Sequence, residues 1–273
     1  MKKTIYTLIV ILLSLVLLVS AFMLGNYFLE SKKQAERQNA LTQLKEEAKS
    51  QSTQPTQPEK PGETKPTEPE ATFGAEKIRD ENGMLVEYGK IYEQNNDLVG
   101  WIRIDGTKID YPVMQTPDNP NYYLKRNFDG QSSDWGTIYA REECDINEPS
   151  DNITIYGHNM MDGSMFQNLN AYEDKATWEN NPLIFFDTLY EYHVYKIFAV
   201  FKTTASVNQG FKYHNMIDAE SKEDFDKFIK TCKDLSFYDT GITPEYGDKI
   251  ICLSTCEYTL ENGRLVVAAV RIS

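Results

Sequence analysis

The chain has 273 residues and a formal net charge of −13 at pH 7. An acidic balance of this size argues against nucleic acid and other anionic polymers as partners, because like charges repel. The length allows one domain with a full hydrophobic core and, in addition, segments that lie outside that domain.

The first predicted element is a membrane-spanning helix over residues 5–24. This stretch follows Lys2 and Lys3 and holds no charged residue, and a helix of about 20 residues is roughly 30 Å long, enough to cross a bilayer. The alternative is a cleaved signal peptide ending near Ala21, but such peptides have shorter apolar cores. We therefore expect residues 1–29 to be a retained, single-pass anchor in the cell membrane. The short tail before it favours an orientation with the rest of the chain outside the cell.

Residues 30–72 are expected to be a polar linker. Its second half, residues 51–71, holds five prolines among Thr, Gln, Glu and Lys, a composition that cannot build a core. Extended at about 3.1 Å per residue, that half reaches roughly 65 Å. It would hold the following domain away from the membrane.

Residues 73–273 are predicted to form one domain. Leu85, Tyr88, Ile91 and Tyr92 recur at helical spacing, so a helix is expected to open it. Runs of apolar and β-branched residues bounded by turn residues then predict strands. The predicted strands are 101–105, 111–115, 136–140, 152–156, 183–186, 192–203, 249–255 and 264–272.

A further helix is expected inside an insertion between Thr203 and Lys249. Ser221, followed three residues later by Asp224, resembles a capping box. The apolar residues after it fall on one helical face; they are Phe225, Phe228, Ile229, Cys232 and Leu235. A short helix is also predicted over residues 164–172.

Three chemically useful side chains stand at predicted strand ends. Cys256 follows the strand 249–255, Arg264 begins the next strand, and His158 comes just after the strand 152–156. Adjacent antiparallel strands joined by a short loop bring their facing ends together, so Cys256 and Arg264 are expected to share one pocket. A thiol, an imidazole and a fixed positive charge are the groups that covalent acyl transfer requires.

The segment 253–256 (Leu-Ser-Thr-Cys), with Arg264 downstream and His158 upstream, resembles the sortases, the cell-surface cysteine transpeptidases of Gram-positive bacteria. The family pattern is Thr-Leu-x-Thr-Cys, and here Cys252 stands where the first Thr is usual. The resemblance covers residues 73–273, and the helices predicted at its start and before the cysteine-bearing strand are similar to class B. It implies a mostly β fold with peripheral helices, an eight-stranded and mostly closed β-barrel.

The resemblance also implies roles for single residues. Cys256 would be the nucleophile, His158 would exchange protons with the leaving and attacking amines, and Arg264 would hold the substrate backbone and the oxyanion. The implied substrate-binding residues are Leu124, Tyr156, Ser254, Thr255 and Glu257. The two remaining histidines, His193 and His214, are expected to be structural or solvent-exposed. No spacing of histidines and cysteines suits a metal ion, so neither a metal nor another cofactor is expected.

The implied reaction cuts a C-terminal sorting motif in a secreted protein and transfers that protein to an amine, expected to belong to a peptidoglycan cross-bridge. Class B substrates carry motifs of the Asn-Pro-x-Thr-Asn kind, with Pro-x-Thr-Gly variants. Three alternatives stay open: pilin polymerisation onto a lysine, hydrolysis by water, and a non-enzymatic surface-binding module that uses the Tyr-rich loop 121–124. The chain has no Asp-Pro dipeptide, which weighs against the polymerising class C branch.

The other cysteines are assigned separately. Cys252 and Cys256 are four residues apart on one predicted strand, about 13 Å, which is too far for a disulfide. Cys232 is expected to pack in the core. Cys144 lies in an acidic loop, and a bridge between Cys144 and Cys232 stays open.

Overall fold

The computed structural model describes residues 2–52 and 79–273. From residue 53 onward the predicted linker lies outside the described residues, as does the predicted start of the domain at residue 73. The chain divides into two compact units, Met1–Leu41 and Thr42–Ser273.

The first unit, in its described residues, is part of helix α1 (Lys2–Ser52). By length and composition, α1 is the one helix among the described residues that is able to cross a membrane. The sequence predicted a polar linker from residue 30 onward, whereas the helix continues to Ser52. The continuation has a simple reason, since the first proline of the chain comes only at Pro55.

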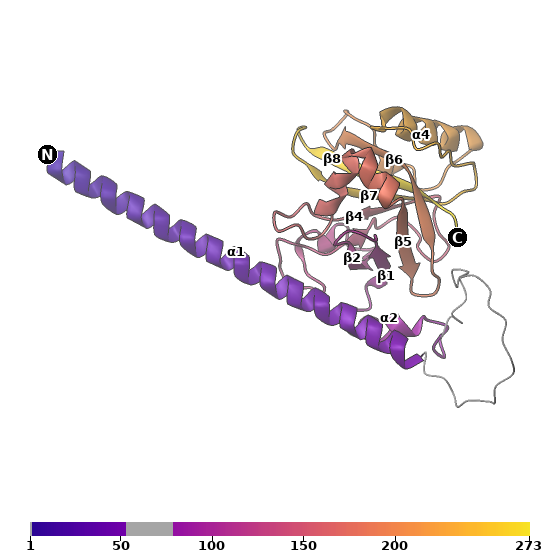
Figure 1. Cartoon of the computed structure of the whole chain (residues 1–273), viewed down its shortest axis with the longest axis horizontal. Helices are drawn as coiled ribbons and strands as arrows, with labels where there is room; N and C mark the ends of the chain where they lie inside the picture. Colours follow the sequence, from indigo (N-terminus) through magenta and orange to yellow (C-terminus); the bar gives the residue numbers. More distant parts are fainter. Residues whose placement is uncertain (1, 53–78) are drawn as a thin grey trace, which may run out of the picture. The chain divides into compact units, whose positions relative to one another are not determined.

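The second unit is built on eight strands that close into a barrel in the order β1-β2-β3-β4-β7-β8-β6-β5 (Figure 1). The strands are β1 (Leu98–Arg103), β2 (Asp110–Met114), β3 (Tyr139–Ala140), β4 (Asn152–Tyr156), β5 (Leu183–Thr188), β6 (Val194–Thr204), β7 (Ile250–Glu257) and β8 (Gly263–Arg271). Neighbours are antiparallel except for the parallel pairs β2–β3 and β4–β7. The pairing of β1 with β5 closes the ring, so the expected eight-stranded barrel is confirmed.

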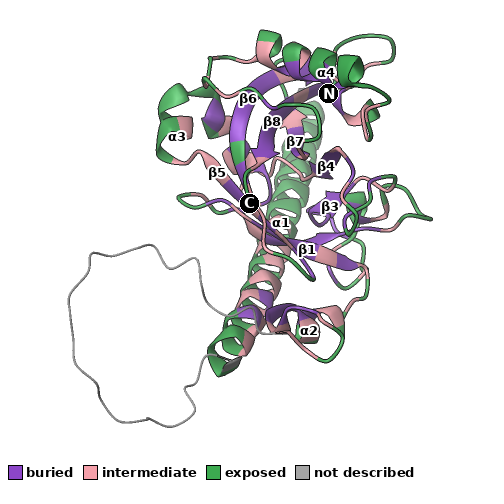
Figure 2. Cartoon of the chain, turned by 90° about the vertical axis from the view of Figure 1, so that its right-hand side faces the viewer, coloured by how far each residue is buried: buried purple, intermediate pink, exposed green. Residues whose placement is uncertain are grey.

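The inserted helix covers one side of the barrel. Helix α4 (Lys222–Leu235) begins where the Ser221 hydroxyl accepts a hydrogen bond from the Asp224 amide at 3.2 Å, as the capping pattern predicted. Its apolar face packs against residues of β6, β7 and β8 in one buried cluster. Strands β7 and β8 are therefore buried almost throughout (Figure 2).

Several local predictions differ from the structure. Of the strand expected over residues 136–140, only β3 forms. Gly136 takes a φ of +60° in a turn, and the strand begins after that turn. The helix expected over residues 164–172 is the 3-10 helix η2 (Gln167–Glu173). The opening helix is α2 (Val86–Tyr92). The elements that were not predicted are η1 (Tyr122–Lys125), α3 (Lys175–Asn180) and η3 (Tyr213–Asn215).

Candidate active site

The parallel pair β4–β7 brings His158 level with Cys256. The register pairs Tyr156 with Ser254, and two further residues along each strand lie His158 and Cys256. The pairing continues past the end of β4, because the Gly157 amide donates to the Ser254 carbonyl at 3.1 Å. The Thr255 hydroxyl also donates to the Gly157 carbonyl at 2.8 Å. The two chains thus stay in register up to the imidazole and the thiol.

The antiparallel pair β7–β8 brings Arg264 to the same place. Its register pairs Cys256 directly with Arg264 and Glu257 with Gly263. A tight turn joins the two strands, and Asn262 takes a φ of +51° there, a conformation that asparagine adopts more readily than most residues. The expected proximity of the thiol and the guanidinium therefore follows from the hairpin itself.

These three strand ends surround one cavity of about 230 Å³. Its lining residues are Asn121, Leu124, Tyr139, Tyr156, Gly157, His158, Thr204, Ala205, Phe211, Tyr213, His214, Ser254, Thr255, Cys256 and Arg264. The cavity brings together all three residues expected to be catalytic. It also brings together four of the five expected to bind substrate.

Glu257 is the expected substrate-binding residue that does not line the cavity. Its side chain is only 4% exposed and pairs with Lys202 at 3.2 Å. Its two carboxylate oxygens accept hydrogen bonds from the amides of Thr259 at 2.8 Å and Leu260 at 3.1 Å. Through these hydrogen bonds, Glu257 fixes the turn between Cys256 and Arg264.

His158 is held by a backbone carbonyl. Its Nε2 lies 2.7 Å from the Leu124 carbonyl oxygen, and because a carbonyl only accepts, Nε2 carries the proton in this contact. Nδ1 is then the nitrogen that can exchange a proton with a bound molecule. The preceding residue must be small, since a Cβ on Gly157 would lie 2.5 Å from Ile138 and 2.6 Å from Phe166.

Asn159 ties the two strand ends together beyond the histidine. Its Nδ2 donates to the Cys256 carbonyl at 2.9 Å. The Tyr258 hydroxyl donates to the Asn159 carbonyl at 3.3 Å. These two contacts fix the backbone that carries the thiol to the backbone that carries the imidazole.

The charge around the cavity is neutral to positive. Of the described residues that line it, none is a carboxylate, and Arg264 is a permanent cation. The guanidinium donates from Nη1 to the carbonyls of Gly263 at 2.8 Å and Asn262 at 3.3 Å. Burial raises the pKa of Tyr156 to about 12, so this wall residue stays neutral.

Sequence reasoning missed the part of the wall that comes from the insertion. Phe211, Tyr213 and His214 all line the cavity. His214, which was expected to be structural or solvent-exposed, is partly buried and is one of these lining residues. Burial, with help from nearby Arg141, lowers its pKa below the ordinary value for histidine. No local pattern marks these residues, because the fold brings them to Cys256 from more than forty positions away in the sequence.

The four cysteines are all free. Cys144, Cys232 and Cys252 are buried, and burial raises the pKa of each thiol. The bridge between Cys144 and Cys232 that the sequence left open is not formed. Cys232 lies in the core cluster under α4, as predicted.

Comparison with known proteins gives the family. The sortase domain family matches residues 102–272. Sortase B of Listeria monocytogenes is 35% identical over 184 residues, which cover 66% of this chain and 72% of that protein.

Solved structures agree with this result. A Staphylococcus aureus sortase B–substrate complex matches with a TM-score of 0.72 and 25% identity, and the match covers 90% of this chain and 99% of that one. A sortase B described as complexed with triglycine matches with a TM-score of 0.62 and 29% identity, over 68% of this chain and 86% of that one. The chain therefore belongs to the sortase family of cysteine transpeptidases, in its class B branch.

Proposed function

We propose that this chain is anchored in the cell membrane, cuts a sorting motif in secreted proteins, and transfers them to an amine of the cell-wall peptidoglycan. One observation carries the proposal: Cys256, His158 and Arg264 come from three neighbouring strand ends and line one cavity. The related structures support it, since one is a complex with substrate and another a complex with triglycine, a peptide with a free amine.

The first step forms a thioester on Cys256. The thiolate sulfur attacks the carbonyl carbon of the threonine in the sorting motif, and the carbonyl oxygen gains negative charge. The C–N bond of the peptide then breaks, and its nitrogen leaves as an amine after taking a proton from His158. The acyl part of the substrate stays on the sulfur.

Arg264 is suited to the negative charge that develops in this step. Its Nη1 is engaged with the carbonyls of Asn262 and Gly263. These bonds hold the guanidinium in place, and because no hydrogen bond to the described residues engages Nε or Nη2, their hydrogens are available to the substrate oxygen. A donor fixed before the reaction stabilises an oxyanion better than a mobile one.

The second step releases the product. The nitrogen of an acceptor amine attacks the thioester carbonyl, His158 takes a proton from that nitrogen, and the C–S bond breaks to return the thiolate of Cys256. An acceptor from a peptidoglycan cross-bridge suits an enzyme anchored beneath the wall. The pilin-lysine acceptor and the non-enzymatic binding module are not favoured.

The anchor and its orientation are part of this proposal. Residues 5–24 of α1 would cross the bilayer, with the barrel on the outer side facing the cell wall. By resemblance to class B, the motif would be of the Asn-Pro-x-Thr-Asn or Pro-x-Thr-Gly kind.

The test uses the full chain in detergent with a panel of motif peptides and triglycine as the amine. We expect a ligated product by mass spectrometry, and more hydrolysed peptide when triglycine is left out. The variant Cys256→Ala should form neither product, while Cys252→Ala should form both. Ligation by Cys256→Ala, or hydrolysis alone at every triglycine concentration, would contradict the proposed transpeptidation.

A further inference from the structure

The imidazole of His158 is held from outside its own strand. His158 is half-buried and stands two residues past the end of β4, so the sheet places its backbone but does not orient its ring. The ring is held by η1, whose Leu124 carbonyl oxygen lies 2.7 Å from Nε2. The position of that carbonyl therefore decides where Nδ1, the nitrogen that exchanges protons, is directed.

The carbonyls on either side of the Leu124 carbonyl are both engaged by the turn that precedes β3. The Thr137 amide donates to the Tyr123 carbonyl at 3.0 Å. The Ser133 amide donates to the Lys125 carbonyl, also at 3.0 Å. These two bonds fix the peptide groups before and after the Leu124 carbonyl, and they hold that carbonyl in the direction of the imidazole.

Gly136 lets the same turn lie directly against both η1 and the imidazole. It takes a φ of +60°, in the region that glycine adopts without steric cost. A Cβ at this position would lie 2.7 Å from the carbonyl oxygens of Tyr123 and Leu124. It would also lie 3.1 Å from Cδ2 of His158. A side chain here would therefore displace the two groups that form the contact between Leu124 and His158.

A buried tyrosine attaches η1 to the barrel. Tyr123 is 1% exposed, and its hydroxyl donates to Oδ2 of Asp97 at 2.7 Å and accepts from Nδ2 of Asn95 at 2.8 Å. The same Nδ2 donates to the Phe128 carbonyl at 2.6 Å, beyond the C-terminal end of η1. Asp97 directly precedes β1, so the Tyr123 hydroxyl connects η1 to the start of a barrel strand.

From these contacts we propose that η1 and the turn 133–136 form a backbone clamp on the ring of His158. Tyr123 is the positioning residue that holds the clamp on the barrel, and Gly136 is the residue that lets it close. This inference rests on the proposed function, in which His158 gives and takes a proton.

The clamp suits a ring that changes its charge during the reaction. With Nε2–H donating to Leu124, only Nδ1 gains and loses a proton, so Nε2 keeps its hydrogen in the neutral and in the charged ring. The bond to Leu124 is therefore kept through both steps. A ring held in one orientation meets the leaving and the attacking nitrogen without having to reorient.

The experiment observes the clamped hydrogen by nuclear magnetic resonance. The full chain is prepared in detergent with ¹⁵N-labelled histidine, and His158→Gln identifies the signals of residue 158 among the three histidines. In the parent chain we expect a hydrogen on Nε2 of His158. It should exchange with water at least about tenfold more slowly than in free histidine, because it is bonded to a fixed carbonyl.

Tyr123→Phe removes only the hydroxyl that attaches η1 to the barrel. It should bring the exchange at Nε2 to within about threefold of free histidine, and lower kcat about tenfold with KM within about twofold. The matched control is Tyr172→Phe. Tyr172 is also buried, in the 3-10 helix η2, and its hydroxyl donates to the Asn181 carbonyl at 2.8 Å. This control loses a buried hydrogen bond that does not involve η1, so it should keep slow exchange and kcat within about twofold.

Gly136→Ala tests the clamp from its other side. It should speed the exchange at Nε2 and lower kcat as Tyr123→Phe does, because the added methyl group displaces the Leu124 carbonyl. Gly241→Ala is its control, since Gly241 takes a φ of +71° and an added Cβ would meet nothing within 4 Å. This control has similar backbone strain without the clash, and should keep slow exchange. If one of the two test variants does not fold, the other decides.

The outcomes separate the clamp from the proposed function. A parent chain that ligates no peptide, with its Nε2 hydrogen still slow, would overturn the proposed function and uphold the clamp. An active parent chain with fast exchange at Nε2, or with the hydrogen on Nδ1, would overturn the clamp alone. Slow exchange that survives in Tyr123→Phe and Gly136→Ala would overturn both positioning roles, and so would a fall in kcat no larger than that of the matched controls.

Discussion

The two ends of β7 show how one residue type takes opposite roles on one strand. Cys252, in the buried half, is 0% exposed, and burial raises the pKa of its thiol. Cys256, four residues later, is half-buried on the cavity and paired with Arg264 across the hairpin. The protein thus keeps one sulfur as a small apolar side chain and presents the other to substrate.

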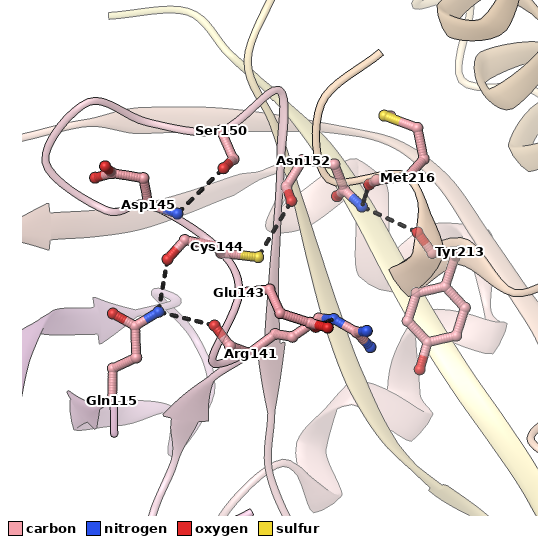
Figure 3. Close-up of polar contacts among 9 residues, drawn as sticks. All are labelled: Gln115, Arg141, Glu143, Cys144, Asp145, Ser150, Asn152, Tyr213 and Met216. Atoms are coloured by element: carbon pink, nitrogen blue, oxygen red, sulfur yellow. Dashed lines mark hydrogen bonds and ion pairs between the residues drawn. The ribbon is translucent and has the colours of Figure 1, made fainter. Parts of the chain in front are cut away.

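The paired strand β4 repeats this division. Its buried end carries Asn152, whose side-chain amide donates a hydrogen bond to the Tyr213 carbonyl (Figure 3). Its cavity end leads to His158, whose ring faces the Leu124 carbonyl. In both strands the interior half fixes positions and the exposed end supplies the reacting group. Position along the strand, rather than residue type, decides which role a side chain has.

The largest expected effect compares the two cysteines of β7. Cys256→Ala should reduce the ligation rate on the order of 10⁴-fold or more, because the covalent route is lost. Cys252→Ala should keep activity within about threefold and lower stability by about 1 kcal/mol, since it removes only core packing. Steady-state ligation and thermal unfolding of both variants check this. Similar activity losses in the two variants would contradict the assignment of different roles to the buried cysteine and the cavity cysteine.

The second effect compares the two arginines of β8. Arg264→Lys should lower kcat about 10²-fold. The guanidinium is held through Nη1 and offers its other N–H groups to the oxyanion in a fixed geometry, which a lysine side chain lacks. Arg271→Lys, at the far end of the strand, should change kcat less than twofold. The measurement is single-turnover thioester formation. Equal rates for Arg264→Lys and the parent chain would remove Arg264 from the reaction.

The hairpin that pairs Cys256 with Arg264 could be read from the sequence because it is local, whereas the place of His158 beside them was implied by the resemblance to sortases. The strand 152–156 was predicted with the bounds that β4 has, and the residues at the ends of β4, β7 and β8 were placed correctly in one cavity. The turn 213–216 could not be found this way. Its position depends on hydrogen bonds to Asn152 over 61 and 64 residues, and no periodicity records a contact of that range.

Glu257 shows the other limit of sequence reasoning. The resemblance to sortases implied that Glu257 contacts substrate, but alternation along a strand turns neighbouring side chains to opposite faces. Its carboxylate therefore meets Lys202 instead of the cavity. Cys256 and Glu257 are neighbours in the sequence, but only the first of them lines the cavity.

A third, smaller effect compares the two acidic partners of Lys202. Glu257→Gln should lower stability by about 2 kcal/mol at pH 7, because Glu257 is buried and hydrogen-bonded. Glu173→Gln, which removes the partner that is 41% exposed, should cost less than about 1 kcal/mol. Urea unfolding of each variant measures both values. Equal losses would mean that burial does not distinguish the two pairs.

The same comparison has a pH dependence. Burial acts to raise the pKa of Glu257, but hydrogen bonds from Thr259 and the ion pair with Lys202 outweigh it, so the pKa lies below its ordinary value. A carboxyl whose folded pKa is lowered stabilises the protein above its unfolded pKa, about 4.3. That contribution is lost as the pH falls through the folded value. The stability difference between the parent chain and Glu257→Gln should therefore shrink below about pH 4.

The smallest effect concerns a polar group in the interior half of β4. Thr154 is 0% exposed, and within the described part of the chain its hydroxyl has no hydrogen-bond partner. Thr154→Val keeps the shape and removes the cost of an unpaired hydroxyl, so it should raise stability by about 0.5–1 kcal/mol. Activity should stay within about twofold, because Thr154 does not line the cavity. A lower free energy of unfolding for Thr154→Val than for the parent chain would show that this hydroxyl forms a hydrogen bond in solution. The interior half of β4 would then hold a second polar contact besides the one at Asn152.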